Sequence, residues 1–214
     1  METFLNTFEP KALDTWTNSH APLDNGYDFV VRKARHFKSP LRGFQHEYIV
    51  LDIEPHPSRP QPLWSQKLLD IPRAKGRFRG LKFDARDTIG ILTDTDIAQL
   101  PNNPPTLSWT RSNAPSLRSV LRLINRIHTK IPHYSVFLDS CYVFSAAVFL
   151  AIHTMFDGTE GQSAQSITVR RGFLFGVIPT VATWRARWVV QQAIALYNTP
   201  QGGKSFFFLQ NNNR

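Results

Sequence analysis

The chain has 214 residues, of which 42% are hydrophobic and 12% aromatic. This composition suffices for one sizeable core and excludes an intrinsically disordered protein. Lys and Arg outnumber Asp and Glu by 25 to 16, giving a net charge of +9 with neutral His, which favours acidic partners such as nucleic acid, anionic lipid or acidic protein. The single cysteine excludes an intramolecular disulfide framework. The N-terminus lacks the pattern of a secretory signal, so we expect a reduced intracellular, cytoplasmic compartment.

One domain is expected over residues 26–197. Residues 1–25 and 198–214 contain Asn, Thr, Gly, Pro and Gln without a clear hydrophobic period. We interpret both ends as frayed or partner-dependent segments.

The first half of the domain predicts strands. Residues 44–53 (FQHEYIVLDI) are rich in β-prone side chains, and residues 63–71 form a second apolar run. Between them, residues 54–62 contain four prolines and predict a loop. We therefore expect an antiparallel hairpin, followed by a third strand near residues 87–92. Residues 26–38 are compatible with a short strand or a helical turn.

The second half predicts helices, after a breaker-rich linker at residues 101–113. Ser116 is expected to cap an amphipathic helix that runs to Lys130, because apolar residues recur there at helical spacing. A second helix begins near Cys141 and stops at Gly158. Its apolar side chains lie nearly all round, which predicts a buried central helix. At about 17 residues it is shorter than the ~20 needed to span a bilayer.

A third helix is expected after the break at Pro179, with Trp184 and Trp188 on or beside its apolar face. Tryptophans among arginines are typical of a helix that lies on a membrane surface. The same residues also suit a packing helix whose arginines extend to solvent. We favour packing.

Cys141 and His46 are the candidate catalytic pair. A thiol at the start of a helix is activated by the helix dipole and by a nearby imidazole, and a histidine held on a strand can act as base and then as acid. A hairpin register folded about position 58 places Asp70 opposite His46, which makes Asp70 the first choice for the orienting residue, with Glu54 and His56 as alternatives.

Each candidate also has a purely structural interpretation. A free cysteine in an apolar segment is commonly a small buried hydrophobe. A strand histidine such as His46 can hydrogen-bond at a sheet edge, and Asp70 can close a strand or pair with an arginine. No His or Cys spacing suggests a metal site, so we expect neither a metal nor another cofactor.

Two blocks resemble known proteins: GFQHEYIVLDI at residues 43–53 and PHYSVFLDSCYVFSAAVFLAI at residues 132–152. Their order, strand histidine and then helix cysteine, is similar to circularly permuted papain-like domains. These include NlpC/P60-related lecithin:retinol acyltransferase-like proteins, PPPDE-type peptidases and fungal proteins of this type. The resemblance implies an α+β domain whose antiparallel sheet packs on a buried cysteine-bearing helix. It also implies a Cys141 nucleophile with His46 as base, acting on an acyl- or peptide-containing substrate.

Two departures leave other functions open. Ser140 stands where the acyltransferase-like members have Asn, and no second histidine follows His46 at the usual spacing, so the domain is alternatively an inactive binding module. A basic nucleic-acid-associated protein is the other alternative, although no specific nucleic-acid motif is present. It predicts that arginines of residues 117–130 and 73–86 converge. An anionic or membrane-surface partner also suits the charge, and the oligomeric state stays open.

Overall fold

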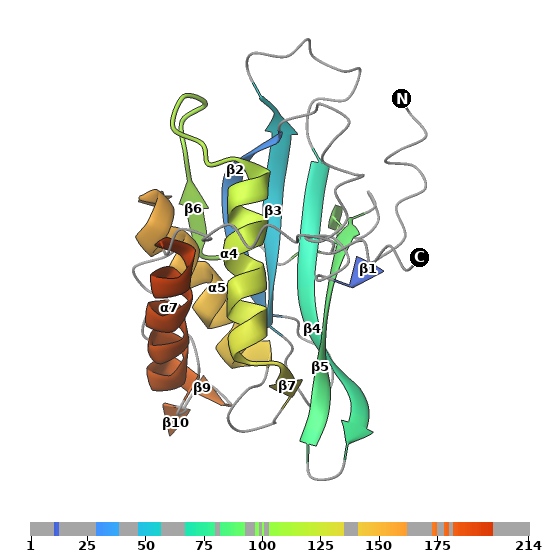
Figure 1. Ribbon diagram of the computed structural model, residues 1–214. Helices are drawn as coiled ribbons and strands as arrows, with labels where there is room; N and C mark the ends of the chain where they lie inside the picture. Colours follow the sequence, from blue (N-terminus) through green and yellow to red (C-terminus); the bar gives the residue numbers. More distant parts are fainter. Residues whose placement is uncertain are drawn as a thin grey trace, which may run out of the picture.

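The computed structural model describes residues 11–12, 29–38, 47–56, 67–79, 82–92, 97–98, 100, 103–134, 141–161, 173–174, 178–179 and 182–198. Nearly all of the two expected terminal segments therefore lies outside the described residues. The described part is an α+β structure with an open antiparallel sheet and three helices (Figure 1), which confirms the expected class. None of its helices is both long enough and apolar enough to cross a membrane.

The centre of the sheet is an antiparallel meander of four consecutive strands. They are β2 (Phe29–Lys38), β3 (Glu47–Pro55), β4 (Lys67–Arg79) and β5 (Lys82–Ile91). The full order is β1-β5-β4-β3-β2-β6-β8, with β7 also paired to β5. The short strands are β1 (Lys11–Ala12), β6 (Thr106–Ser108), β7 (His133–Tyr134), β8 (Thr159–Glu160) and the separate pair β9 (Phe173–Leu174) and β10 (Ile178–Pro179).

The expected hairpin is confirmed as β3 paired with β4, and the segment that suited a strand or a turn is the strand β2. The third expected strand is β5. The short strands were not expected. One of them, β6, lies inside the breaker-rich linker at 101–113, where three residues pair with β2.

Strand β3 is buried on both faces of the sheet. Ile49 and Leu51 belong to the large core under the helices, whereas Val50 packs on the other face with Phe37 and Leu68. Because side chains alternate along a strand, odd-numbered residues of β3 face the helices. This alternation decides below which polar residues can meet the cysteine helix.

Three helices, α4 (Leu117–Lys130), α5 (Cys141–Phe156) and α7 (Ala182–Asn198), lie on one face of the sheet (Figure 1). The Ser116 side chain accepts a hydrogen bond from the backbone N–H of Ser119 at 3.2 Å, so the expected cap is confirmed. The expected central helix is also confirmed: α5 contacts β2, β3, β4 and both other helices.

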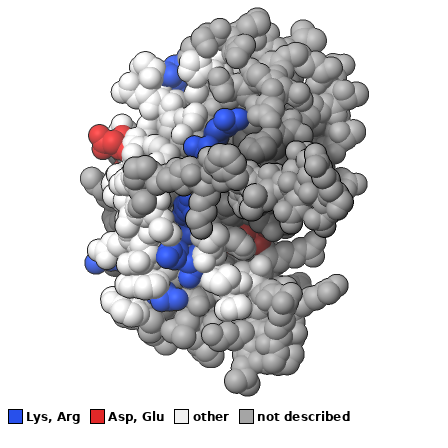
Figure 2. All heavy atoms as spheres, in the orientation of Figure 1, with Lys and Arg blue, Asp and Glu red and all other residues white. Residues whose placement is uncertain are grey.

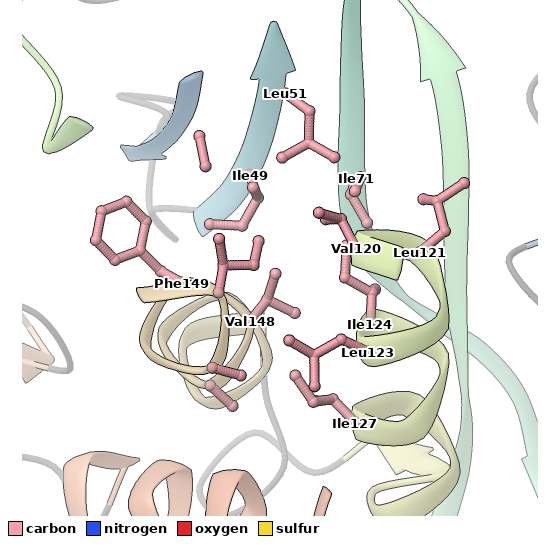
Figure 3. Packing of buried hydrophobic residues seen from close by; sticks show 14 of the residues in the cluster. Ile49, Leu51, Ile71, Val120, Leu121, Leu123, Ile124, Ile127, Val148 and Phe149 are labelled. Carbon is pink, nitrogen blue, oxygen red and sulfur yellow. The ribbon is translucent and has the colours of Figure 1, made fainter. Parts of the chain in front are cut away.

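The core lies where α4 and α5 meet the sheet (Figure 3). Each fully buried side chain of this size contributes roughly 1.5–3 kcal/mol relative to exposure. The residues that converge there are Ile49, Leu51 and Ile71 from the strands, Val148 and Phe149 from α5, and Val120, Leu121, Leu123, Ile124 and Ile127 from α4.

Helix α7 packs, but not through its tryptophans. Trp184 is 66% exposed and Trp188 is 39% exposed. The favoured interpretation is thus right for the helix and wrong for these two side chains. The tryptophans were expected on or beside the apolar face, but the face that docks on α4 and α5 consists of the smaller residues Ala186, Val189, Val190 and Ala193.

The end of α5 is shaped by a close approach between Gly158 and Trp109. Asp157, with φ 45°, takes the left-handed position after the helix. The indole N–H of Trp109 donates to the carbonyl oxygen of Phe156 at 2.7 Å. A Cβ added to Gly158 would lie 2.7 Å from Cζ2 of Trp109. The expected stop near Gly158 is confirmed, but the glycine there provides space for the indole.

We expect Gly158→Ala to destabilise the protein by about 1–3 kcal/mol, because the added methyl group forces Trp109 from its place. The free energy of unfolding in urea measures this effect. Gly161→Ala is the matched control, since its added Cβ would lie 3.7 Å from the nearest atom. Equal losses in the two variants would contradict the packing argument.

Candidate functional site

Cys141 is the first residue of α5 and is 2% exposed. It is buried but is not a member of the large hydrophobic cluster that contains most other buried residues of this helix. The first turn of α5 contains no acidic residue. The thiol therefore lies at the positive end of the α5 helix dipole.

A buried histidine–carboxylate pair lies on the face of the sheet toward α5. His36 Nε2 and Glu47 Oε2 are 2.8 Å apart, and the residues are 5% and 3% exposed. Because His36 is opposite Ile49 in the β2–β3 register, the pair is a diagonal contact across two strands. The His36 ring also lies 5.8 Å from the ring of Phe149 on α5.

One face of α5 lies toward this pair. It contains Phe149 and two polar residues, Tyr142 and Ser145, because these three follow the three- and four-residue spacing that places side chains on one side of a helix. Burial, and then the charges of Cys141 and Glu47, raise the pKa of Tyr142 to about 12. The side chain of Tyr142 at the start of α5 therefore interacts electrostatically with that of Glu47 at the start of β3.

Two polar atoms of this interface are buried without a hydrogen-bond partner: Nδ1 of His36 and Oγ of Ser145. Leaving such groups unsatisfied costs roughly 1–3 kcal/mol each. A polar cluster of this kind, inside an interface that is otherwise apolar, is the strongest candidate site among the described residues. We call His36, Glu47, Cys141, Tyr142 and Ser145 the inner polar cluster.

The sequence analysis found only Cys141 of this cluster. His46 lies outside the described residues. His36 was missed because residues 26–38 were not assigned to a strand, so the inward side of the segment was not defined. Glu47 was not considered as a site residue. Side chains alternate between the two faces of a strand, so Glu47, two residues before the inward-facing Ile49, could have been placed on the helix side.

The predicted register for Asp70 is wrong by four positions. Asp70 is opposite Val50 rather than His46, and Val50 lies on the face away from α5. Burial, and then the charge of Asp70, raise the pKa of Tyr48 on this same face. The physical reason is that β3 continues to Pro55 and β4 begins only at Lys67, so the turn is centred two positions later than expected.

The alternative orienting residues lie elsewhere in the fold. Glu54 is seven residues along β3 from Glu47, or about 23 Å at the rise of an extended strand. Its carboxylate forms ion pairs with Arg32 at 3.4 Å and Arg111 at 3.6 Å. His56 follows the same end of β3.

A second histidine–carboxylate pair joins α4 to the sheet. Nδ1 of His128 lies 2.6 Å from Oδ2 of Asp87, whose side chain is fully buried. His128 is in the last turn of α4, where a positive charge is favourable. The pair fixes the C-terminal end of this helix against β5.

We expect Glu47→Leu to destabilise the protein by about 1–3 kcal/mol, because it leaves Nε2 of His36 buried without its hydrogen-bond partner. The double variant His36→Leu/Glu47→Leu removes both polar groups and should lose less than the single variants together. The free energy of unfolding in urea checks both. For comparison, Glu160→Ala breaks a partly exposed 3.7 Å pair with His153 and should cost no more than about 1 kcal/mol. An equally small effect of Glu47→Leu would show that the buried pair is unimportant.

The raised pKa of Tyr142 predicts a pH dependence at high pH. The unfolded state releases the phenol proton at about pH 10 and the folded state at about pH 12. This contribution to stability is therefore full below pH 10 and is lost between pH 10 and 12. We expect the urea midpoint of Tyr142→Phe to fall less steeply than that of the wild type over this range. Parallel curves would indicate a solvated phenol.

The inner polar cluster has the groups for nucleophilic and acid–base chemistry: a thiol, a carboxylate, an imidazole, a phenol and a hydroxyl. Within the described ranges, no group of three or more His, Cys, Asp or Glu residues is arranged to hold a metal ion. No protein-family model, curated protein or solved structure matches this chain.

Proposed function

We propose that this chain is a cysteine-dependent hydrolase or acyltransferase of the permuted papain-like type. The observation that carries the proposal is the position of Cys141 as the first residue of the buried helix α5. In this mechanism Cys141 Sγ attacks an acyl carbonyl and forms a thioester. The bond to an alcohol or amine breaks, and the leaving group takes the proton that His46 removed from the thiol. Water or a second acceptor then releases the acyl group.

The start of α5 supports both the nucleophile and the stabilisation of charge. Backbone N–H groups in the first turn of a helix have no acceptor within the helix, so they can donate to the oxyanion of a tetrahedral intermediate. No acidic side chain in this turn opposes the developing negative charge. The same dipole favours the thiolate form of a cysteine there.

The proximity of the two sequence blocks is supported by the link between Tyr142 and Glu47. Tyr142 directly follows Cys141 in the sequence, and Glu47 directly follows His46. The two sequence blocks that carry the resemblance thus have neighbouring members that interact. Asp70 is not part of this mechanism, because it lies on the opposite face of the sheet.

A binding module without chemistry is the second candidate. The observation that favours it is the 2% exposure of Cys141, because a nucleophile must reach the carbonyl carbon that it attacks. A nucleic-acid-associated function required the arginines of 73–86 to converge with those of α4, and the side chains of 73–79 lie outside the described residues.

The rate of Cys141 alkylation by iodoacetamide as a function of pH tests the proposal, because the chain has only one cysteine. We expect labelling with a midpoint below the ~8.5 of an ordinary thiol, and a shift toward that value in His46→Ala. His153→Ala is the matched control. This histidine is twelve residues further along α5, about 18 Å from Cys141, and its replacement should leave the profile unchanged.

Three results would contradict the proposal in different ways. Labelling that is slow at every pH and reaches the normal rate only in denaturant would indicate a buried structural thiol. Labelling that is fast but indifferent to His46→Ala would remove His46 as base. If the midpoint of labelling shifts in His36→Ala and not in His46→Ala, and circular dichroism shows that the variant is folded, the base is His36 of the inner polar cluster.

A further inference from the structure

The exposed side of α4 has a row of positive charges. Arg118, Arg122, Arg126 and Lys130 are each four residues apart and so follow one side of the helix. Arg118 and Arg122 are exposed, and the other two are partly exposed. In Figure 2 the blue Lys and Arg atoms run along the described face over α4, and red acidic atoms are few there. Like charges at this spacing destabilise a helix, so folding does not explain the row.

Most of the basic side chains on the helices have no acidic partner within the described part of the chain. None of Arg122, Arg126, Lys130 and Arg187 forms an ion pair there. None of the helices α4, α5 and α7 contains an Asp or Glu residue. On the sheet, by contrast, Arg35 Nε donates to Asp52 at 2.9 Å.

Beside this row, α7 presents exposed tryptophans. Trp184 and Trp188 are one turn apart on the exposed side of the helix, at 66% and 39% exposure. Arg185 and Arg187 flank them, and the Arg185 guanidinium carbon lies 4.6 Å from the centre of the Trp188 ring. Because α4 and α7 pack against each other, the row and the tryptophans lie on neighbouring helices. We call these residues of the two helices the basic helical surface.

We infer that the basic helical surface docks on an anionic membrane surface. Anionic headgroups match the exposed basic side chains, and the interfacial layer of a bilayer favours tryptophan, whose ring is apolar and whose N–H is polar. Leu196, further along the exposed side of α7, is 37% exposed and can enter the same layer. This inference goes beyond the proposed chemistry and does not depend on it, because it uses none of the residues of the inner polar cluster.

Nucleic acid is the less favoured partner. Single-stranded nucleic acid is bound by stacking bases on open aromatic faces, but the Arg185 guanidinium lies over one face of Trp188. The basic row on α4 has no aromatic side chain beside its arginines on the same helix. An exposed leucine has no role in contacts with phosphate or base, whereas it contributes apolar area to lipid.

The test uses the full chain and co-sedimentation with vesicles. One set contains phosphatidylcholine with about a third phosphatidylserine, and the other contains phosphatidylcholine alone. Each basic residue near an anionic surface changes the partition coefficient about fivefold. We expect binding only to the anionic vesicles, about fivefold weaker for Arg122→Gln and about 25-fold weaker for Arg122→Gln/Arg187→Gln. Trp184→Ala should also weaken binding, and high salt should abolish it.

Lys33→Gln is the matched control. Lys33 is exposed on β2, opposite Asp52 in the register, on the face of the sheet away from the helices, and its loss gives the same change in net charge. It should leave partitioning within twofold of the wild type. Equal effects of Lys33→Gln and Arg122→Gln on vesicle binding would overturn the inference. Equal binding of the wild type to anionic and neutral vesicles, or no binding to either kind, would also overturn it. Binding to a single-stranded oligonucleotide that Arg122→Gln weakens, without vesicle binding, would also overturn it in favour of nucleic acid.

Discussion

Helix α5 has to be buried around most of its circumference, and the arrangement of the other elements follows from that requirement. Val143, Phe144, Ala147, Val148 and Ala151 are all inaccessible to solvent, although they lie on different sides of the helix. One sheet face covers only one side of a helix. The remaining sides are covered by α4 and α7, which contact both α5 and each other. The docking face of α7 is made of small side chains because it must lie close to α5.

The inner polar cluster is the exception within this apolar interface. Burying His36 with Glu47 is at best neutral compared with two apolar residues of the same size, and the unsatisfied atoms of His36 and Ser145 add a cost. Stability alone therefore does not account for these residues. A cost of this kind is common where polar groups serve a site. The cluster also touches the first turn of α5, where the nucleophile of the proposed mechanism lies.

The features that the sequence predicted are those with local signals. The cap at Ser116, the period of α4 and the β-prone run of β3 all depend on residues that are near one another in the chain. The position of Asp70 depends on how far two strands continue into a turn, and proline fixes its own φ angle without fixing that length. The His36–Glu47 pair joins residues eleven positions apart, so it becomes visible only once both strands and their register are known.

The exposed side of α7 shows a different reason why a feature could not be predicted from the sequence. The spacing of Trp184 and Trp188 along the helix predicted a position on or beside the apolar face, but exposed positions are free of packing constraints and are available to other functions. A glutamate four residues from Arg122 or Arg126 would stabilise α4 by a few tenths of a kcal/mol, yet the helix has none. On the sheet, the carboxylates of Asp52 and Glu54 pair with arginines, and that of Asp87 contacts His128. The helices α4, α5 and α7, by contrast, form a positive layer that contains no acidic residue of its own. A positive layer of this kind acts over about a Debye length, ~8 Å at physiological salt, and so favours an anionic surface that lies directly against α4 and α7.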